Sequence, residues 1–274
     1  MPADCADCLQ NPAVPMQMTS ARWRSPRRPP ASAAFKVSRR SSAQNWGLAP
    51  RRAHASTKWA KPIRSPPARD EGYACVTLHV GSGFEDDATM LAVCEDIVKA
   101  SQRHAIPLYV ETHRATITTD IWRTIQLARR LPELRFNGDF SHWYTGHEMV
   151  YGDLAAKLEM IGPVFERVRF IHGRIGNPGC MQVDIGDGTG RTYVDHFKEM
   201  WTRSLVGFLK SAKPGDYICF TPELLPPNIY YARVFKNAQG ELREECDRWQ
   251  QALLYCEIAK NCFEAAKQRI KTHP

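Results

Sequence analysis

The chain has 274 residues, of which 43% are hydrophobic, so it is long enough to bury a core of ordinary size. Its net charge of +8 is unevenly spread, because residues 1–70 hold 13 Lys and Arg against three acids while residues 71–274 hold 24 basic and 26 acidic side chains. The near-neutral larger part argues against a nucleic-acid partner, and the lack of an apolar run of roughly 18 residues argues against a membrane span.

Residues 1–70 are rich in Arg, Pro, Ser and Ala and show no sustained apolar period. Such a segment buries too little apolar surface to offset the entropy lost on ordering, so we predict a disordered basic tail. An organellar transit peptide has a similar composition but usually starts with basic residues, whereas this chain opens with Met-Pro-Ala-Asp-Cys. An altered reading frame or a misplaced initiation upstream of a shortened gene is a third interpretation of the segment.

The nine cysteines are an odd number, and several lie in apolar runs. This usage is typical of reduced core residues in a cytosolic protein rather than of a disulfide framework. We therefore predict a cytoplasmic location, with organellar targeting by the basic tail left open.

From residue 73 onward, strand-like runs alternate with helix-like segments. The short apolar or aromatic runs lie at residues 73–80, 106–110, 134–138, 168–171 and 217–222. Helical segments are predicted at residues 87–104, 120–130 and 194–209, and a long amphipathic helix at residues 241–270. This alternation indicates parallel βαβ units and therefore an α/β fold.

Four side chains that can bind a metal stand near the ends of four of these runs: Glu111, Asp139, His172 and Glu223. In a (β/α) barrel the carboxyl ends of the strands converge on one face. Three carboxylates and one imidazole would make a mostly oxygen site, which suits Mn²⁺, Mg²⁺ or Co²⁺ better than structural zinc. Each residue also has a structural explanation, as a helix cap, a loop charge, a buried histidine with its own partners, or part of a turn.

Four strings carry a resemblance to a known family: LYVETHR at residues 108–114, NGDFSHW at 137–143, IHGR at 171–174 and TPEL at 221–224. In this order they resemble the xylose isomerase-like barrel superfamily, and within it the sugar phosphate isomerase/epimerase branch, over residues 72–263. The resemblance implies a (β/α)8 TIM barrel. It also implies one divalent metal ion, with Mn²⁺ favoured over Mg²⁺ or Co²⁺, held by Glu111, Asp139, His172 and Glu223.

The same resemblance implies proton transfer beside the carbonyl group of a small polyhydroxy substrate, such as a sugar, a sugar phosphate or an inositol ketone. Glu111 and Glu223 would form the acid and base pair, and His142 and Arg174 would contact the substrate. We assign His79 to the substrate as well. His113, His147 and His196 are interpreted as surface or supporting residues. The residues do not decide between isomerisation, epimerisation and dehydration.

The predicted strands account only for strands four to eight of such a barrel, so residues 71–274 are predicted to form a partial barrel. No strands one to three are recognisable in residues 1–70. The chain would then be a truncated member of the family, an inactive remnant, or a protein whose barrel is completed by another copy.

Apurinic endonucleases of the endonuclease IV type share this barrel and are the alternative reading. Residues 78–83, together with Asp139 and His142, fit their pattern. Their trinuclear zinc site, however, needs an Asp-x-His after the strand that carries His172, and residues 183–188 contain no histidine.

Overall fold

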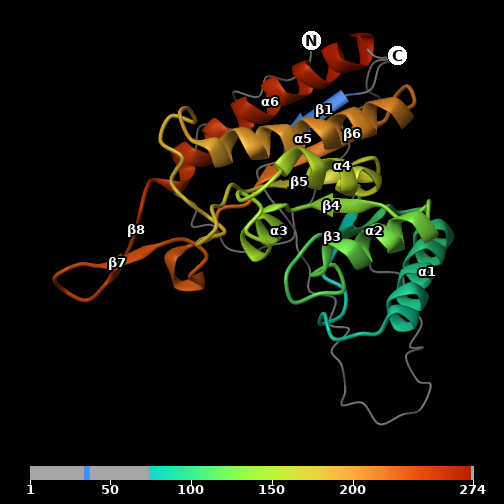
Figure 1. Cartoon of the computed structure of the whole chain (residues 1–274), viewed down its shortest axis with the longest axis horizontal. Coiled ribbons are helices and arrows are strands. Elements are labelled where there is room, and N and C mark those ends of the chain that lie inside the picture. Colours follow the sequence, from blue (N-terminus) through green and yellow to red (C-terminus); the bar gives the residue numbers. More distant parts are fainter. Residues whose placement is uncertain (1–33, 38–73, 273–274) are drawn as a thin grey trace.

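The computed structural model describes residues 34–37 and 74–272 (Figure 1). Most of the tail that we predict to be disordered lies outside the described residues. The exception is residues 34–37, which form a strand, β1 (Ala34–Val37), where none was predicted. The remaining elements in chain order are β2 (Val76–Leu78), α1 (Asp87–His104), β3 (Leu108–Glu111), α2 (Ile121–Arg130), β4 (Phe136–Gly138), α3 (Ser141–Gly146), α4 (Leu154–Phe165), β5 (Val168–Gly173), α5 (Thr192–Ser211), β6 (Tyr217–Pro222), η2 (Pro227–Ile229), β7 (Val234–Lys236), β8 (Leu242–Glu244) and α6 (Arg248–Thr272).

The fold is α/β, as predicted, and its main sheet is parallel with the strand order β1-β6-β5-β4-β3-β2. The five strands β2 to β6 follow one another in chain order and curl into a half-barrel. Strand β1 extends the sheet at the β6 edge, with Ala34 beside Tyr217 and Val37 beside Phe220. No strand was predicted in this segment, because a run of four residues is too short to show a two-residue period.

The longer helices pack against one another in chain order, with the short α3 outside the series: α1 on α2, α2 on α4, α4 on α5, and α5 on α6. Three of them start at an aspartate whose carboxylate accepts a backbone N–H of the first turn, namely Asp86, Asp120 and Asp153. Such caps satisfy donors that have no partner within the helix. They explain why α1 and α2 begin where the sequence pattern predicts.

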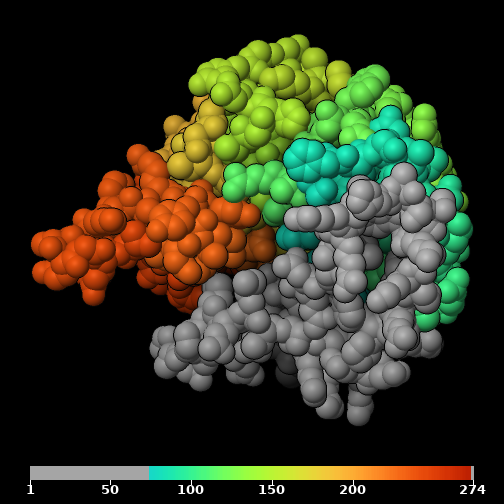
Figure 2. Space-filling view, turned by 90° about the horizontal axis from the view of Figure 1, so that it is seen from below, coloured from blue at the N-terminus to red at the C-terminus, as the bar shows by residue number. Residues whose placement is uncertain are grey.

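The C-terminal helix begins later than predicted. Residues 241–247 were assigned to it, but β8 pairs with β7 in an antiparallel hairpin that projects from the body of the molecule (Figures 1 and 2). Asp247 then accepts the backbone N–H groups of Trp249 and Gln250. Leu242–Glu244 therefore forms a strand, and the helix starts at Arg248.

Aromatic side chains pack helices α5 and α6 against strand β6, which precedes Glu223. On α5, the buried Trp201 packs edge-on against Phe220 of β6, with ring centroids 5.0 Å apart, and against Tyr255 of α6 at 6.2 Å. At the end of β5, a Cβ atom on Gly173 would lie 2.1 Å from the Phe220 ring. Glycine is therefore required between His172 and Arg174 for β5 and β6 to approach closely. No helix in the described part of the chain is long and apolar enough to cross a bilayer.

Candidate metal centre

The four predicted ligands lie at the carboxyl ends of four consecutive strands. Glu111 is the last residue of β3, Asp139 follows β4 directly, His172 lies near the end of β5 and Glu223 follows β6. Because parallel neighbours end at the same edge of a sheet, their donor atoms lie within 4.8 Å of one another. Glu111, Asp139 and His172 are buried, and the Glu223 side chain is 14% exposed.

Both glutamates contact the same ring nitrogen. His172 Nδ1 lies 3.3 Å from Glu111 Oε2 and 3.4 Å from Glu223 Oε2. Asn137 of β4 holds this group in place: its amide donates to Glu111 Oε2 at 3.0 Å, and its Oδ1 accepts the backbone N–H of His172 at 3.1 Å. Asn137 was not predicted as a site residue, although its position two residues before Asp139 on a buried strand was an available signal.

Arg174 supplies a buried cation between Asp139 and Glu223. Its Nη2 contacts Asp139 Oδ2 directly and lies 2.9 Å from Glu223 Oε2. Ser141, also missed by sequence reasoning, donates from its Oγ to Asp139 Oδ1 at 2.6 Å and accepts from Arg174 Nε at 3.0 Å. The buried His142 adds Nε2 at 3.2 Å from Arg174 Nη2 and 3.5 Å from Asp139 Oδ2. These residues together form one polar network.

Burial disfavours the charged form of each of the four ligand candidates, but ionic contacts outweigh it for three of them. Against burial, His172 and His79 hold the pKa of Glu111 well below its usual range. Against burial, Arg174 and His142 lower the pKa of Asp139 to about 2. Glu223 and Glu111 likewise overcome burial and raise the pKa of His172 to about 9.

Glu223 behaves differently from Glu111. Its burial raises its pKa, and the neighbouring His172 and Arg174 do not fully reverse this effect. The two glutamates thus shift in opposite directions although they contact the same imidazole. Such a pair, in which one carboxyl stays ionised and the other holds a proton more readily, is suited to acid and base roles.

Three histidines line one side of the centre. His79, just after β2, places Nε2 at 3.1 Å from Glu111 Oε1. The His113 ring lies between those of His79 and His142, at centroid distances of 4.2 and 3.7 Å. Tyr231, from the segment after η2, contacts the His142 ring edge-on at 5.8 Å and the guanidinium of Arg174 at 4.9 Å.

The structure thus brings together all seven predicted site residues, namely Glu111, Asp139, His172, Glu223, His142, Arg174 and His79. His147 is exposed, and His196 hydrogen-bonds Tyr144 at 2.7 Å, so neither belongs to the centre. His113 was interpreted as a surface or supporting residue, and it lies within the group. Tyr231 was missed because it lies far along the chain, in a segment without a recognisable motif.

The donor set fits a divalent cation. When His172 is neutral, as a metal ligand must be, the three ionised carboxylates and Arg174 leave a net charge of −2 in a largely buried volume. An uncompensated charge in such a place is costly, and a divalent ion balances it. Oxygen-rich donors with one imidazole match the preferences of Mg²⁺ and Mn²⁺.

Comparisons with protein-family models, with curated proteins and with solved structures gave no match. Within residues 34–37 and 74–272, two clusters could hold a metal: the four residues above, and His79 with Glu111 and His113. A third cluster, as the trinuclear endonuclease site requires, is not found among these residues.

Proposed function

We propose that the protein is a divalent-metal-dependent isomerase or epimerase of small polyhydroxy carbonyl compounds, built on part of a xylose isomerase-like barrel. The observation that carries the proposal is the pair Glu111 and Glu223, which reach one imidazole from two different strands and have pKa values shifted in opposite directions. A reaction that removes a proton from one carbon and returns it to the same or the neighbouring carbon needs such a pair.

The reaction requires no oxidant or reductant. Glu111, which is held ionised, accepts the proton from the carbon beside the carbonyl. The electron pair of that C–H bond forms a carbon–carbon double bond, and the carbonyl π pair moves onto the carbonyl oxygen, which gives an enediolate. Glu223 then donates its proton to carbon. Delivery to the opposite face of the same carbon restores the carbonyl and gives the epimer. Delivery to the former carbonyl carbon, with the neighbouring hydroxyl proton passing to the other oxygen, gives the isomer. A divalent ion bound by Glu111, Asp139, His172 and Glu223 would lower the energy of the negative charge that develops on the substrate oxygens.

The remaining residues bind and orient the substrate in this proposal. Arg174 presents a fixed positive charge beside Glu223, and His142 and His79 offer ring nitrogens at the same edge of the sheet. The Tyr231 ring contacts both Arg174 and His142, so it would shield part of both side chains from water. These groups suit a compact, hydroxyl-rich ligand.

The position of β1 supports the partial-barrel interpretation. In a closed barrel the first strand pairs in parallel with the last, and β1 pairs in this way with β6. The sheet has six strands, with β1 and β2 at its edges. Among the residues that the structure describes, this sheet does not close on itself, which favours a second candidate, an inactive remnant that retains the ligand set without turnover.

Glu223→Gln separates the two candidates. We expect the variant to keep the fold and to lose about 10² to 10⁴-fold in turnover of sugar or inositol ketones, since a general acid contributes that much. The rate at which epimer or isomer forms, followed by NMR, checks this directly.

The matched control is Glu245→Gln, which removes a carboxylate paired with Arg233 outside the centre. Unchanged product formation in Glu223→Gln would sink the acid role. Metal binding by the wild type without any turnover, across a panel of ketoses, aldoses and inositol ketones, would favour the remnant.

A further inference from the structure

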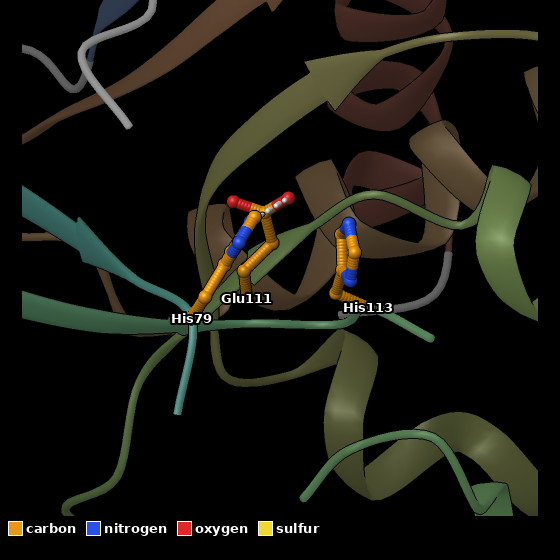
Figure 3. Close-up of side chains that lie close together, drawn as sticks. All are labelled: His79, Glu111 and His113. Atoms are coloured by element: carbon orange, nitrogen blue, oxygen red, sulfur yellow. Dashed lines mark ion pairs between the residues drawn. The ribbon is translucent and has the colours of Figure 1, made fainter. Parts of the chain in front are cut away.

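A second cluster lies beside the four-residue centre and shares one residue with it. His79, Glu111 and His113 each offer a ligand atom, and these atoms lie within 4.8 Å of one another. They come from the ends of β2 and β3, and Figure 3 shows the two imidazoles near the Glu111 carboxylate. Two nitrogen donors and one oxygen donor make this cluster chemically different from the oxygen-rich centre.

The two oxygens of Glu111 face different neighbours. Oε1 is the atom that contacts His79 Nε2 at 3.1 Å. Oε2 accepts from Asn137 Nδ2 at 3.0 Å and lies 3.3 Å from His172 Nδ1. One carboxylate can therefore serve both clusters, each through its own oxygen.

His113 is held in the tautomer that a metal ligand needs. Its Nδ1 lies against the backbone carbonyl of Arg114, which can only accept, so the ring proton is on Nδ1 and the lone pair is on Nε2. Histidines that bind metals usually donate their other ring N–H to a carbonyl or carboxylate in this way.

The loop that carries His113 is fixed by two threonine side chains. The backbone N–H of His113 donates to Thr118 Oγ1 at 2.9 Å, and its carbonyl accepts from Thr116 Oγ1 at 2.7 Å. Thr118 Oγ1 also donates to the Glu111 carbonyl at 2.6 Å. A backbone hydrogen bond of 2.8 Å, donated by Ile117 N–H to the carbonyl oxygen of Val80, joins this loop to the segment after His79. The three side chains are therefore positioned before any ligand arrives.

We propose that His79, Glu111 and His113 form a second divalent-metal site that takes zinc and keeps an open coordination position. Two imidazoles and one carboxylate are a donor set that zinc prefers, and three protein ligands leave the fourth position free for water or substrate. His79 is 29% exposed and His113 is half-buried, so solvent reaches these two histidines. The proposal is independent of the isomerase function, although Glu111 takes part in both sites.

The test is zinc stoichiometry of the full-length chain, measured by elemental analysis after equilibration with zinc and removal of free metal. We expect two ions per wild-type chain, and one in His79→Ala and in His113→Ala. Asp139→Asn should also retain one ion, bound by the histidine pair. Absorption of the Co²⁺-loaded protein, which reports the number of nitrogen ligands and the coordination number, should lose one component in His113→Ala and a different one in Asp139→Asn.

His147→Ala is the control, because His147 is exposed and lies outside both clusters, and it should bind two ions. Circular dichroism of each variant verifies that it is folded. If the wild-type chain bound only one ion, and His113→Ala retained that ion with unchanged affinity, the proposal would be overturned. If the wild type bound one ion that Asp139→Asn retained and His113→Ala lost, the histidine site would be upheld and metal binding by the four-residue centre would be contradicted. The failure of each site is therefore distinguishable from the failure of the other.

Discussion

The two clusters share Glu111 but differ in what surrounds them. The centre formed by Glu111, Asp139, His172 and Glu223 is mostly buried and contains its own cation, Arg174. In the second cluster, His79 and His113 are half-buried, and Glu111 is the one acid among the three residues. A buried group of carboxylates must be compensated within the protein, whereas a half-exposed imidazole is solvated by water. Changes in the buried centre should therefore cost stability, and changes in the histidine pair should mainly affect ligand binding.

The largest expected effect on stability comes from Arg174→Met. Removing the guanidinium leaves Asp139 and Glu223 without their buried counter-ion, and we expect a loss of about 3 to 5 kcal/mol in the free energy of unfolding. Urea titration followed by circular dichroism measures it, and saturating Mn²⁺ should recover part of the loss. Arg114→Met is the matched control, because Arg114 is exposed and contacts the same Tyr231 ring. Equal losses in the two variants would contradict the comparison.

The pH dependence of stability tests the same centre in chelator-treated protein. The folded pKa of His172 is raised to about 9 from an unfolded value of 6.5. Its protonation therefore contributes stability that is fully present below about pH 6.5 and is lost as the pH rises toward 9. We expect the unfolding free energy to fall between pH 7 and 9 by a few kcal/mol. His172→Gln should flatten this slope, and an unchanged slope would show that His172 is neutral in the folded protein.

A smaller loss is expected for Asn137→Ala. The substitution removes the donor to Glu111 Oε2 and the acceptor for the His172 backbone N–H, which leaves two buried polar groups without these partners. Such losses cost about 1 to 3 kcal/mol. Chemical denaturation measures the effect, with the exposed Gln239→Ala as a control that should be close to neutral. A neutral Asn137→Ala would mean that water replaces the amide.

The smallest stability effect should belong to His113→Ala, at about 0.5 kcal/mol, because the ring is half-buried and its backbone bonds are kept. His172→Ala should cost several times more. Thermal unfolding of the two variants side by side checks the ratio. If His113→Ala were as damaging as His172→Ala, the histidine pair would be part of the structural core rather than a free ligand site.

Much of the fold follows from short segments of sequence. The helix predicted over residues 87–104 is α1, and the helix over 120–130 differs from α2 only in its capping residue Asp120. These helices combine an apolar period with an aspartate cap, so both the element and its start are visible locally. Helices α3 and α4 were not predicted, because α3 has six residues and α4 contains Pro163 and is apolar on most of its surface.

The ligand candidates were recognisable because each stands near the end of a strand-like run, and strand order places such ends together. Asn137, Ser141 and Tyr231 could not be assigned in the same way, since their roles depend on which atoms they meet. Asn137 matters because β4 lies between β3 and β5, and Tyr231 matters because the segment after η2 folds back over His142.

Local sequence was sufficient for the α/β class, the parallel strands and the four ligand candidates, because hydrophobic period and capping act over a few residues. Long-range packing was needed for the opposite pKa shifts of Glu111 and Glu223, for the burial of Arg174 and for the meeting of His79 with Glu111 and His113. These features depend on distances between residues far apart in the chain. Such distances arise only when β2 pairs with β3 and the strand ends converge.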